Sequence, residues 1–558
     1  MKITSEATAS DQLRLSLRKY VPWVLVAFAA VVHLMIAARS VGPMYVFDEI
    51  GYLANANVIA GHGADWSLCG SSYAVGYSAI LAPLWWLPIT AVGIYQIAVF
   101  ISAAFGLLAI WPATLLARRF GAGPNVSIAI GALVALIPTR SLMSNYVLAE
   151  NPLTVLVLCA TILALRVAKN GRRIDHILLG IVAGLAASVH ARALPLVAVT
   201  VAWLVVRAVL KRSSWTNAIL AVIPAIALSV ASLWAQAVIG GQVFADNTRV
   251  DDLVGHLNLV RILEVVLGQA FMQVVSWALL TVLGLIACVS AARADVRRTG
   301  IEGVASAWWW LGGMVLAQAG FVVWVLASSA EYARRFDTPV FGRYLDPFVV
   351  PIAVLGATTL WVRANARLAN AALVTSIVAV LGYGLLVLPR VPLDGIWIPF
   401  AVPGLVPFLD VLSIDDRPGL GVAGLVGLAC AALLWLSQGR ARVGLAAALI
   451  VASTVALGAD WLRVDPLEEG SRAESVTGAF VLANPQVPAT FAADVLPCLE
   501  RNKIQFETAG HVTIVPFGGD YGTGIVVGPK DFPLIRWYGF ERQLFTTFED
   551  AAAWVHHG

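Results

Sequence analysis

Charged residues and cysteines are both scarce in this sequence. Of its 558 residues, 13% are charged, and the formal net charge at pH 7 is +4. Soluble domains carry about 25% charged residues, so the deficit argues against a chain that is solvated mainly by water. Five cysteines are too few for a disulfide scaffold. The small net charge by itself says little about nucleic acid, and we expect none among the partners.

Apolar residues take the place of the missing charges. They make up 59% of the chain, and the mean hydropathy is +0.82. About 20 apolar residues cross the hydrocarbon of a bilayer, and about thirteen runs approach that length. We therefore predict an all-α polytopic bundle in the cell membrane, surrounded by membrane lipids. The predicted spans are 20–38, 91–117, 126–141, 150–167, 175–190, 194–210, 217–239, 268–291, 304–328, 347–363, 370–389, 419–437 and 441–460.

Basic residues set the predicted orientation, because loops on the cytoplasmic side carry an excess of Lys and Arg. With the N-terminus in the cytoplasm, most basic clusters fall inside, among them Arg118–Arg119, Lys211–Arg212 and Arg297–Arg298. The membrane domain then comprises residues 1–460. The more polar residues 461–558 are predicted to form a small extracytoplasmic α/β domain.

The outer loops are predicted to contain structure of their own. The first, residues 39–90, includes the apolar piece 75–87. Pro83 interrupts that piece and Pro88 follows it, so an interfacial or re-entrant helix suits it better than a crossing. Cys69 and Cys498 could pair if both lie outside the cytoplasm. For the C-terminal domain we expect helices at Ala489–Arg501 and Phe548–Val555, and strands at His511–Phe517 and Gly524–Val527.

Acidic residues mark the predicted outer face. Asp48 and Glu49 follow the first span, and Glu150 lies between the third and the fourth. A carboxylate at this depth could take a proton from an acceptor hydroxyl that attacks the anomeric carbon of a sugar. The structural alternative is that Asp48 caps a helix that runs from Glu49 to Ala60. Glu150, likewise, could simply start a helix.

Arginines gather on the same predicted face, where basic residues are disfavoured. A guanidinium forks onto oxyanions, so an anionic ligand such as a lipid phosphate would account for them. Alternatively, Arg192 snorkels to the interface, and Asp337 and Asp346 neutralise their neighbours. The candidates for contact with a donor phosphate are Arg343, Arg192, Tyr344, His190 and Arg335.

A divalent metal ion is a further possibility on this face. Asp251–Asp252 and His256 lie in a polar outer loop, and carboxylate and imidazole ligands of this kind suit divalent ions. Together with Glu49 and Glu150, His256 is a candidate ligand. Solvated loop acids are the commoner interpretation. The sequence contains no Walker loop, dinucleotide fingerprint, zinc spacing or serine elbow.

In this order, the motifs resemble the integral-membrane C-type (GT-C) glycosyltransferases, which include protein O-mannosyltransferases, bacterial aminoarabinose transferases, and mycobacterial arabinosyl- and mannosyltransferases. The likeness covers residues 1–360 and rests on Asp48-Glu49, Gly76-Tyr77 to Trp86, Arg118-Arg119-Phe120-Gly121, Glu150-Asn151-Pro152, Gly184 to Arg192, and Arg343-Tyr344-Leu345-Asp346-Pro347. The resemblance implies an inverting transfer of a pentose or hexose from a polyprenyl-phosphate donor to an envelope glycan, lipid or protein. Asp48 would be the base, Glu49 and Glu150 would position substrate or a metal, and Arg343 and Arg192 would meet the phosphate.

Two other functions fit the same pattern of helices and charges. A lipid or sugar transporter, or a flippase, also uses many helices and intramembrane ions, but such proteins usually show internal repeats and sites at the midplane. We find no repeat. A non-catalytic scaffold of envelope assembly would make the C-terminal domain its working part.

Overall fold

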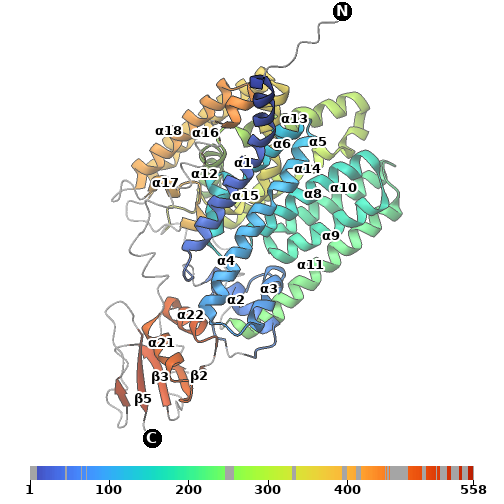
Figure 1. Cartoon of the computed structure of the whole chain (residues 1–558). Coiled ribbons are helices and arrows are strands. Elements are labelled where there is room, and N and C mark those ends of the chain that lie inside the picture. The colour runs from blue at the N-terminus through green and yellow to red at the C-terminus, as the bar shows by residue number, and fades with distance from the viewer. Residues whose placement is uncertain are drawn as a thin grey trace, which may run out of the picture.

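A bundle of helices carries a small α/β domain at one end, and α1 (Ala9–Arg39) begins at the opposite end (Figure 1). Apolar segments form helices here because a helix satisfies its own backbone hydrogen bonds in lipid. The structure is a computed structural model that describes residues 9–43, 47–63, 66–70, 72–244, 257–329, 335–391, 399–409, 416–446, 448, 452, 475–492, 498–510, 512–515, 524–529, 540–542 and 551–556.

Within these ranges, nine helices are long and apolar enough to cross a membrane. There are ten if α6 (Pro124–Leu136) and the segment Pro138–Asn145, which meet at a bend of 65°, are one span. The predicted count of thirteen is not confirmed. Besides α1, the long helices are α4 (Ala91–Leu108) with α5 (Ile110–Arg119), α8 (Glu150–Asn170), α10 (Leu194–Val209), α11 (Trp215–Val243), α12 (Leu259–Trp277), α14 (Ala307–Ala327), α16 (Ala366–Leu386) and α18 (Asp416–Leu436). Other bundle helices are α9 (Arg173–Val189), α13 (Leu280–Thr299) and α15 (Asp346–Thr358).

The predicted span at 268–291 is wrong, because the backbone breaks in its middle. α12 ends at Trp277 and α13 starts at Leu280, with Ala278 at φ 50° between them. The apolar pattern continues through the break and therefore gives no sign of it. A distant residue contacts this point, since Trp277 Nε1 donates to Asp346 Oδ1 at 3.3 Å. The predicted span at 441–460 lies mostly outside the described residues.

Exposed tryptophans support a membrane position for the bundle. α11 exposes Trp215 at its start and Trp234 near its end, and α14 exposes Trp309 and Trp324 in the same way. At 1.5 Å per residue, these pairs are separated by about 28 Å and about 22 Å along their helices. That spacing is close to the thickness of the hydrocarbon layer, and tryptophan prefers the two interfaces.

Small residues let the central helices approach closely. A Cβ on Gly284 of α13 would overlap the carbonyl oxygen of Ile352 in α15, and a Cβ on Gly356 of α15 would overlap the carbonyl oxygen of Leu280. The two glycines thus allow backbone-to-backbone contact, which is a common way for helices to associate in lipid. The turn that contains Arg343 precedes α15, so this contact helps to fix the position of that turn.

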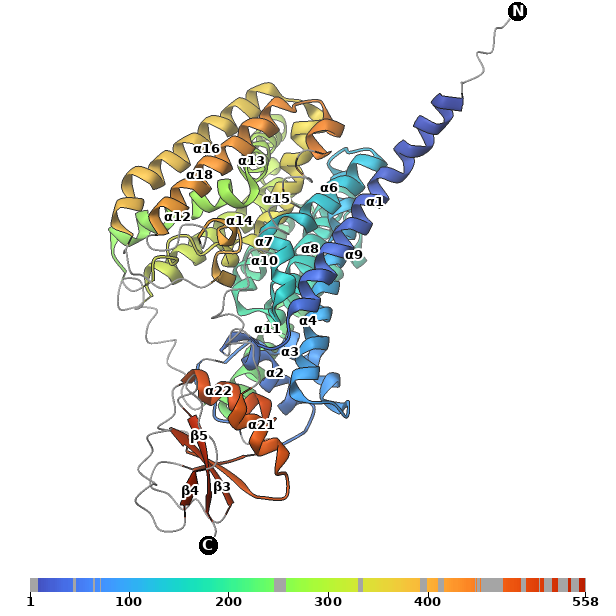
Figure 2. The same ribbon diagram turned by 60° about the vertical axis from the view of Figure 1, so that its left-hand side comes forward.

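Short helices cover the end of the bundle that faces the C-terminal domain (Figure 2). They are α2 (Asp48–Ile59), α3 (Val75–Leu81) and the 3₁₀ turn η1 (Ala82–Trp86). The last two match the short helix predicted at 75–87. Trp85 Nε1 donates to Leu53 O at 3.0 Å and ties η1 to α2.

The C-terminal domain is α/β, as predicted, but two of its segments differ from their predicted secondary structure. Its sheet has the order β2-β1-β3-β5-β4, with β2 and β3 parallel to β1 and the other pairs antiparallel. The helix predicted at Ala489–Arg501 is wrong at its start, where residues 489–492 form a strand, and right at its end, where a helix begins at Cys498. The helix predicted at Phe548–Val555 is wrong in its described part, because residues 551–556 form a strand. Alanine favours helix locally, but pairing within the sheet overrides that preference. The elements are α21 (Val476–Ala483), β1 (Ala489–Ala492), α22 (Cys498–Glu507), β2 (Thr513–Val515), β3 (Gly524–Pro529), β4 (Phe540–Arg542) and β5 (Ala551–His556).

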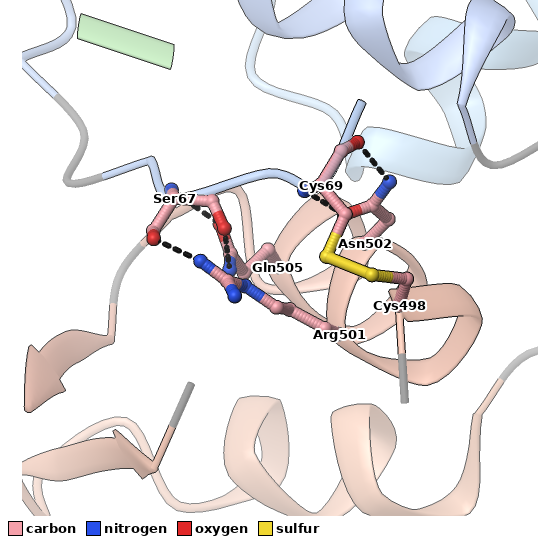
Figure 3. Close-up of a disulfide and its surroundings, with 6 residues drawn as sticks. All are labelled: Ser67, Cys69, Cys498, Arg501, Asn502 and Gln505. Carbon is pink, nitrogen blue, oxygen red and sulfur yellow. Dashed lines mark hydrogen bonds between the residues drawn. A yellow bond between two sulfur atoms is a disulfide. The ribbon is translucent and has the colours of Figure 1, made fainter. Parts of the chain in front are cut away.

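A disulfide between Cys69 and Cys498 joins this domain to the first loop, as the sequence allowed (Figure 3). Their Cα atoms lie 5.6 Å apart. Asn502 of α22 accepts from Cys69 N at 2.9 Å and donates to Cys69 O at 3.0 Å. Gln505 makes the same pair of bonds with Ser67, at 2.8 and 3.2 Å. The loop is therefore held by its backbone along one side of α22.

Candidate functional site

Four buried charged residues meet at the end of the bundle that faces the C-terminal domain. Asp48 and Glu150 are the first residues of α2 and α8. Arg192 and Arg343 lie in 3₁₀ turns, η3 (Ala191–Ala193) and η7 (Gly342–Tyr344), directly before α10 and α15. A helix start favours a negative charge, so both acids stand where the backbone stabilises them. The four residues are between 2% and 8% exposed.

Arg343 lies between the two acids and contacts both. Its Nη2 donates to Asp48 Oδ2 at 2.7 Å, and its Nε lies 2.9 Å from Glu150 Oε1. Arg192 Nη2 donates to the same oxygen of Glu150 at 2.9 Å. Burial lowers the pKa of Arg343, but Glu150 and Asp48 outweigh burial and raise it above its ordinary value. The guanidinium is therefore charged at any physiological pH.

Aromatic rings fix the orientation of both guanidinium groups. Arg343 stacks over Phe400 at 4.2 Å from the ring centre, and Arg192 stacks over Tyr344 at 3.9 Å. His190 adds a lateral contact, since Arg192 Nε donates to His190 Nε2 at 3.0 Å. Cation–π contacts of this kind also compensate in part for the water that a buried guanidinium loses.

Asp48 does not cap α2. Phe47 occupies the N-cap position, and Asp48 is the first helical residue. Its carboxylate contacts other elements instead: Tyr73 O–H donates to Oδ1 at 2.7 Å, and Arg343 holds Oδ2. The capping alternative is thus wrong for Asp48, whereas Glu150 does start a helix.

Glu49 has a different environment from Asp48. It is fully buried, and its Oε1 accepts from Tyr95 O–H and from Val147 N, each at 2.8 Å. These contacts join α2 to α4 and to the segment before α8. Such bonds suit an anchor for the helix that carries Asp48.

Three residues of this region were missed by sequence reasoning. Arg140, which is 3% exposed, donates to Asn151 Oδ1 at 2.7 Å and to Glu150 O at 3.3 Å. It lies inside an apolar span, and that alone could have marked it as a candidate. Tyr73 gave no such signal. Tyr52 is 2% exposed, and burial, followed by Glu150, raises its pKa far above the ordinary value, so its phenol keeps its proton.

Of the remaining candidates, Arg335 borders the cluster and the loop residues cannot be placed. The guanidinium carbons of Arg335 and Arg343 lie 5.5 and 5.9 Å from the centre of the same ring, that of Phe341. Arg335 forms a two-point pair with Asp337, at 3.0 and 2.9 Å, which is the neutralising role that the sequence allowed for Asp337. Asp251–Asp252 and His256 lie outside the described residues. Among the residues that are described, no group of three or more His, Cys, Asp or Glu side chains could hold a metal ion.

Several buried polar atoms at the site lack a hydrogen-bonding partner among the described residues. They include Nη1 and Nε of Arg343, Nη1 of Arg140 and Oε2 of Glu150, and Nε of Arg343 has only its ion contact with Glu150. Buried polar groups are rarely left unsatisfied, because each such group costs about 1–3 kcal/mol. Water or a polar ligand is therefore expected beside them.

An apolar cavity of ≈ 120 Å³ lies within the bundle, and none of the four charged residues lines it. Trp277, Ala278, Gly404, Gly427 and residues of α6 and α18 line it. Trp277 connects the cavity to the start of α15, since its indole donates to Asp346.

Comparison with known proteins points to one fold. No family model and no curated protein matches the chain. ArnT from Cupriavidus metallidurans in the apo state superposes with a TM-score of 0.56 at 15% identity, covering 97% of this chain and 98% of that chain. The same protein bound to undecaprenyl phosphate gives 0.54 at 14% identity, covering 95% and 97%. Arabinosyltransferase EmbB from Mycobacterium smegmatis gives 0.40 at 16% identity, covering 80% of this chain and 41% of that chain.

At such low identities a likeness extends to the fold and not to individual residues. The two ArnT structures nevertheless match over almost the whole chain, including the C-terminal domain. The chain therefore shares the fold of ArnT.

Proposed function

We propose that this protein is a membrane glycosyltransferase that moves a sugar from a polyprenyl phosphate to an acceptor in the cell envelope. The observation that carries the proposal is the buried contact of Arg343 with both Asp48 and Glu150. Group transfer needs a carboxylate near a fixed positive charge, because a proton leaves the acceptor while negative charge builds on the leaving group. The binding of undecaprenyl phosphate by ArnT, which shares the fold, supports the donor class.

In the proposed reaction, Asp48 is the base. Its carboxylate takes the proton of the acceptor hydroxyl as that oxygen forms a bond to the anomeric carbon. The bond between this carbon and the phosphate oxygen breaks on the opposite side, so the anomeric configuration inverts. The polyprenyl phosphate leaves with the bonding electrons, and Arg343 and Arg192 stabilise its charge.

The neighbouring residues position these groups. Glu150 holds both guanidinium groups through Oε1, and Tyr344 supports Arg192 by stacking. His190 keeps Arg192 in place through its ring nitrogen. Glu49 anchors α2, and Arg335, which Asp337 already binds, stays outside the reaction. The apolar cavity beside Trp277 would take a short part of the prenyl chain.

We place the cluster and the C-terminal domain outside the cytoplasm. The disulfide between Cys69 and Cys498 supports this orientation, because disulfides persist in oxidising compartments. The basic residues at the ends of α5 and α13 support it too, since they would lie on the cytoplasmic side. The acceptor is then a glycan, lipid or protein of the envelope.

The test is transfer of radiolabelled sugar from polyprenyl-phosphate donors by purified full-length protein. Asp48→Asn keeps the shape of the side chain and removes the base, so we expect a loss of about 10²–10⁴-fold in turnover. Asp295→Asn on α13 is the matched control and should retain the activity. Turnover retained by Asp48→Asn would remove the base assignment.

The same assay separates the alternative functions. If the unmodified protein transfers no sugar from any prenyl donor but moves lipid across vesicles, it is a transporter or flippase. The charged cluster at one end of the bundle argues against that reading, since transporter sites usually lie near the midplane. A scaffold would lose all function on deletion of residues 461–558, whereas a transferase with an intact bundle would keep part of it.

A further inference from the structure

The space between Asp48 and Glu150 holds a guanidinium group. Two facing carboxylates of a transferase would ordinarily suggest a divalent metal ion, and the sequence made Glu49 and Glu150 candidate ligands. A metal needs several free oxygen or nitrogen donors around one point, six to eight for Ca²⁺ and six for Mg²⁺. The carboxylate oxygens of this site can be checked against that requirement one by one.

The oxygens that could bind a metal are already occupied by donors. Asp48 accepts from Tyr73 at Oδ1 and from Arg343 at Oδ2. Glu150 Oε1 lies within 2.9 Å of both Arg343 and Arg192. Only Oε2 of Glu150 has no hydrogen-bonding partner in the described part of the chain. A metal held by these carboxylates and the other described residues would have to displace at least one buried guanidinium, and the described arrangement therefore does not fit one.

Glu49 does not supply the missing ligands. Its Oε1 already accepts two hydrogen bonds, from Tyr95 and Val147. No cluster of three His, Cys, Asp or Glu side chains exists in the ranges that the structure describes. The carboxylates here are arranged to receive N–H and O–H donors.

We propose that Arg343 is the resident cation of this site, in the position that a divalent metal would otherwise take. Nη2 and Nε neutralise Asp48 and Glu150, and Phe400 fixes the plane of the guanidinium. Nη1 has no protein partner among the described residues and is free to donate to a phosphate oxygen. As far as it concerns sugar transfer, this inference rests on the proposed function, and it makes that transfer independent of divalent metal.

The balance of charge gives the inference a measurable consequence. Within the four-residue cluster, Asp48 and Glu150 carry two negative charges and Arg192 and Arg343 carry two positive charges, so a divalent ion would add net positive charge to these four residues. Removal of Arg343 leaves a net negative site with a cavity beside both carboxylates. Attraction between opposite charges is strong where water is excluded, so this variant should acquire affinity for a divalent ion.

The experiment measures Mn²⁺ binding to the purified full-length protein, after treatment with EDTA and dialysis, by electron paramagnetic resonance. The unmodified protein should show no stoichiometric site. Arg343→Ala should bind one Mn²⁺ at least about tenfold more tightly than the unmodified protein does. The double variant Arg343→Ala/Asp48→Asn should lose that site again. The control is Arg390→Ala, which removes an exposed guanidinium from Glu264 and should bind no more Mn²⁺ than the unmodified protein.

Each other outcome decides against the inference. One Mn²⁺ bound by the unmodified protein and lost in Asp48→Asn would make the site a metal site. No gain of Mn²⁺ in Arg343→Ala would show that the guanidinium does not occupy a metal position. If that variant does not fold, Arg343→Gln takes its place.

The transfer assay adds an arm that separates this inference from the function. Turnover of the unmodified protein should be the same with EDTA as with added Mn²⁺ or Mg²⁺. Loss of turnover in EDTA and its recovery with metal would overturn the inference. Absence of all turnover would instead remove the proposed function, while the Mn²⁺ measurement would still identify the cation.

Discussion

The disulfide of the C-terminal domain is expected to control the transfer rate, although it lies outside the charged cluster. α22 holds residues 67–69 through Cys498 and through four hydrogen bonds from Asn502 and Gln505. A few residues further on, Tyr73 donates to Asp48. Loosening the loop should therefore weaken the hydrogen bond from Tyr73 to the proposed base, Asp48.

The size of the effect follows from that single hydrogen bond. A hydrogen bond to a charged group contributes about 1.5–3 kcal/mol. If all of it is lost in the transition state, Tyr73→Phe lowers the rate by about 10–150-fold, since 1.36 kcal/mol corresponds to a factor of ten. Cys498→Ser leaves the four hydrogen bonds of α22 in place. Tyr73 then leaves Asp48 for only part of the time, and we expect a loss of about two- to tenfold.

Initial rates of the two single variants and of the double variant test this reasoning. Because both changes act through the same bond, the double variant should be no slower than Tyr73→Phe. Cys159→Ser, a change at a free cysteine, is the control and should leave the rate unchanged. If Cys498→Ser slows Tyr73→Phe as strongly as it slows the unmodified protein, the loop does not act through Tyr73.

Two further predictions concern packing and the arginine outside the cluster. Gly284→Ala should lower the free energy of unfolding by about 1–3 kcal/mol, because the new methyl group overlaps the carbonyl of Ile352. Gly320→Ala, where nothing lies within 4 Å of the new atom, should leave stability equal or raise it by about 0.5–1 kcal/mol in the same melting experiment. Arg335→Gln should change the KM for the donor by less than about twofold, since Asp337 already engages this guanidinium. A KM raised tenfold or more would return Arg335 to the phosphate site.

The charged cluster could largely be anticipated from sequence because charge is rare in an apolar chain. Asp48 and Glu150 stand out at the ends of long apolar runs, where ionisable residues are rare and usually functional. Arg343 stands out on a face where basic residues are disfavoured. The distribution of charged residues along the chain predicts the side of the membrane on which these residues lie. It does not give their partners, since residues 48 and 343 meet only through tertiary packing.

Other features escaped because they depend on partners far away in the chain. The break at Ala278 interrupts a run that is apolar throughout, and no local residue announces it. Segments 489–492 and 551–556 contain alanine and look helical, but they pair within one sheet. In the sequence, Tyr73 has no feature that separates it from other loop tyrosines. Its contact with Asp48 of α2 depends on the loop that α22 holds. Local propensity fixes none of these outcomes.

The cluster has to be tested as a unit, because its charges stabilise one another. A buried charge without a partner costs far more than the pair contributes, and breaking a buried pair costs about 3–5 kcal/mol. Glu150 holds two guanidinium groups through one oxygen, so Glu150→Gln would release both Arg192 and Arg343 at once. A large loss of activity in that variant would not assign a chemical step to Glu150. Only the coupling between Glu150→Gln and Arg343→Gln, compared with each change alone, separates positioning from direct participation.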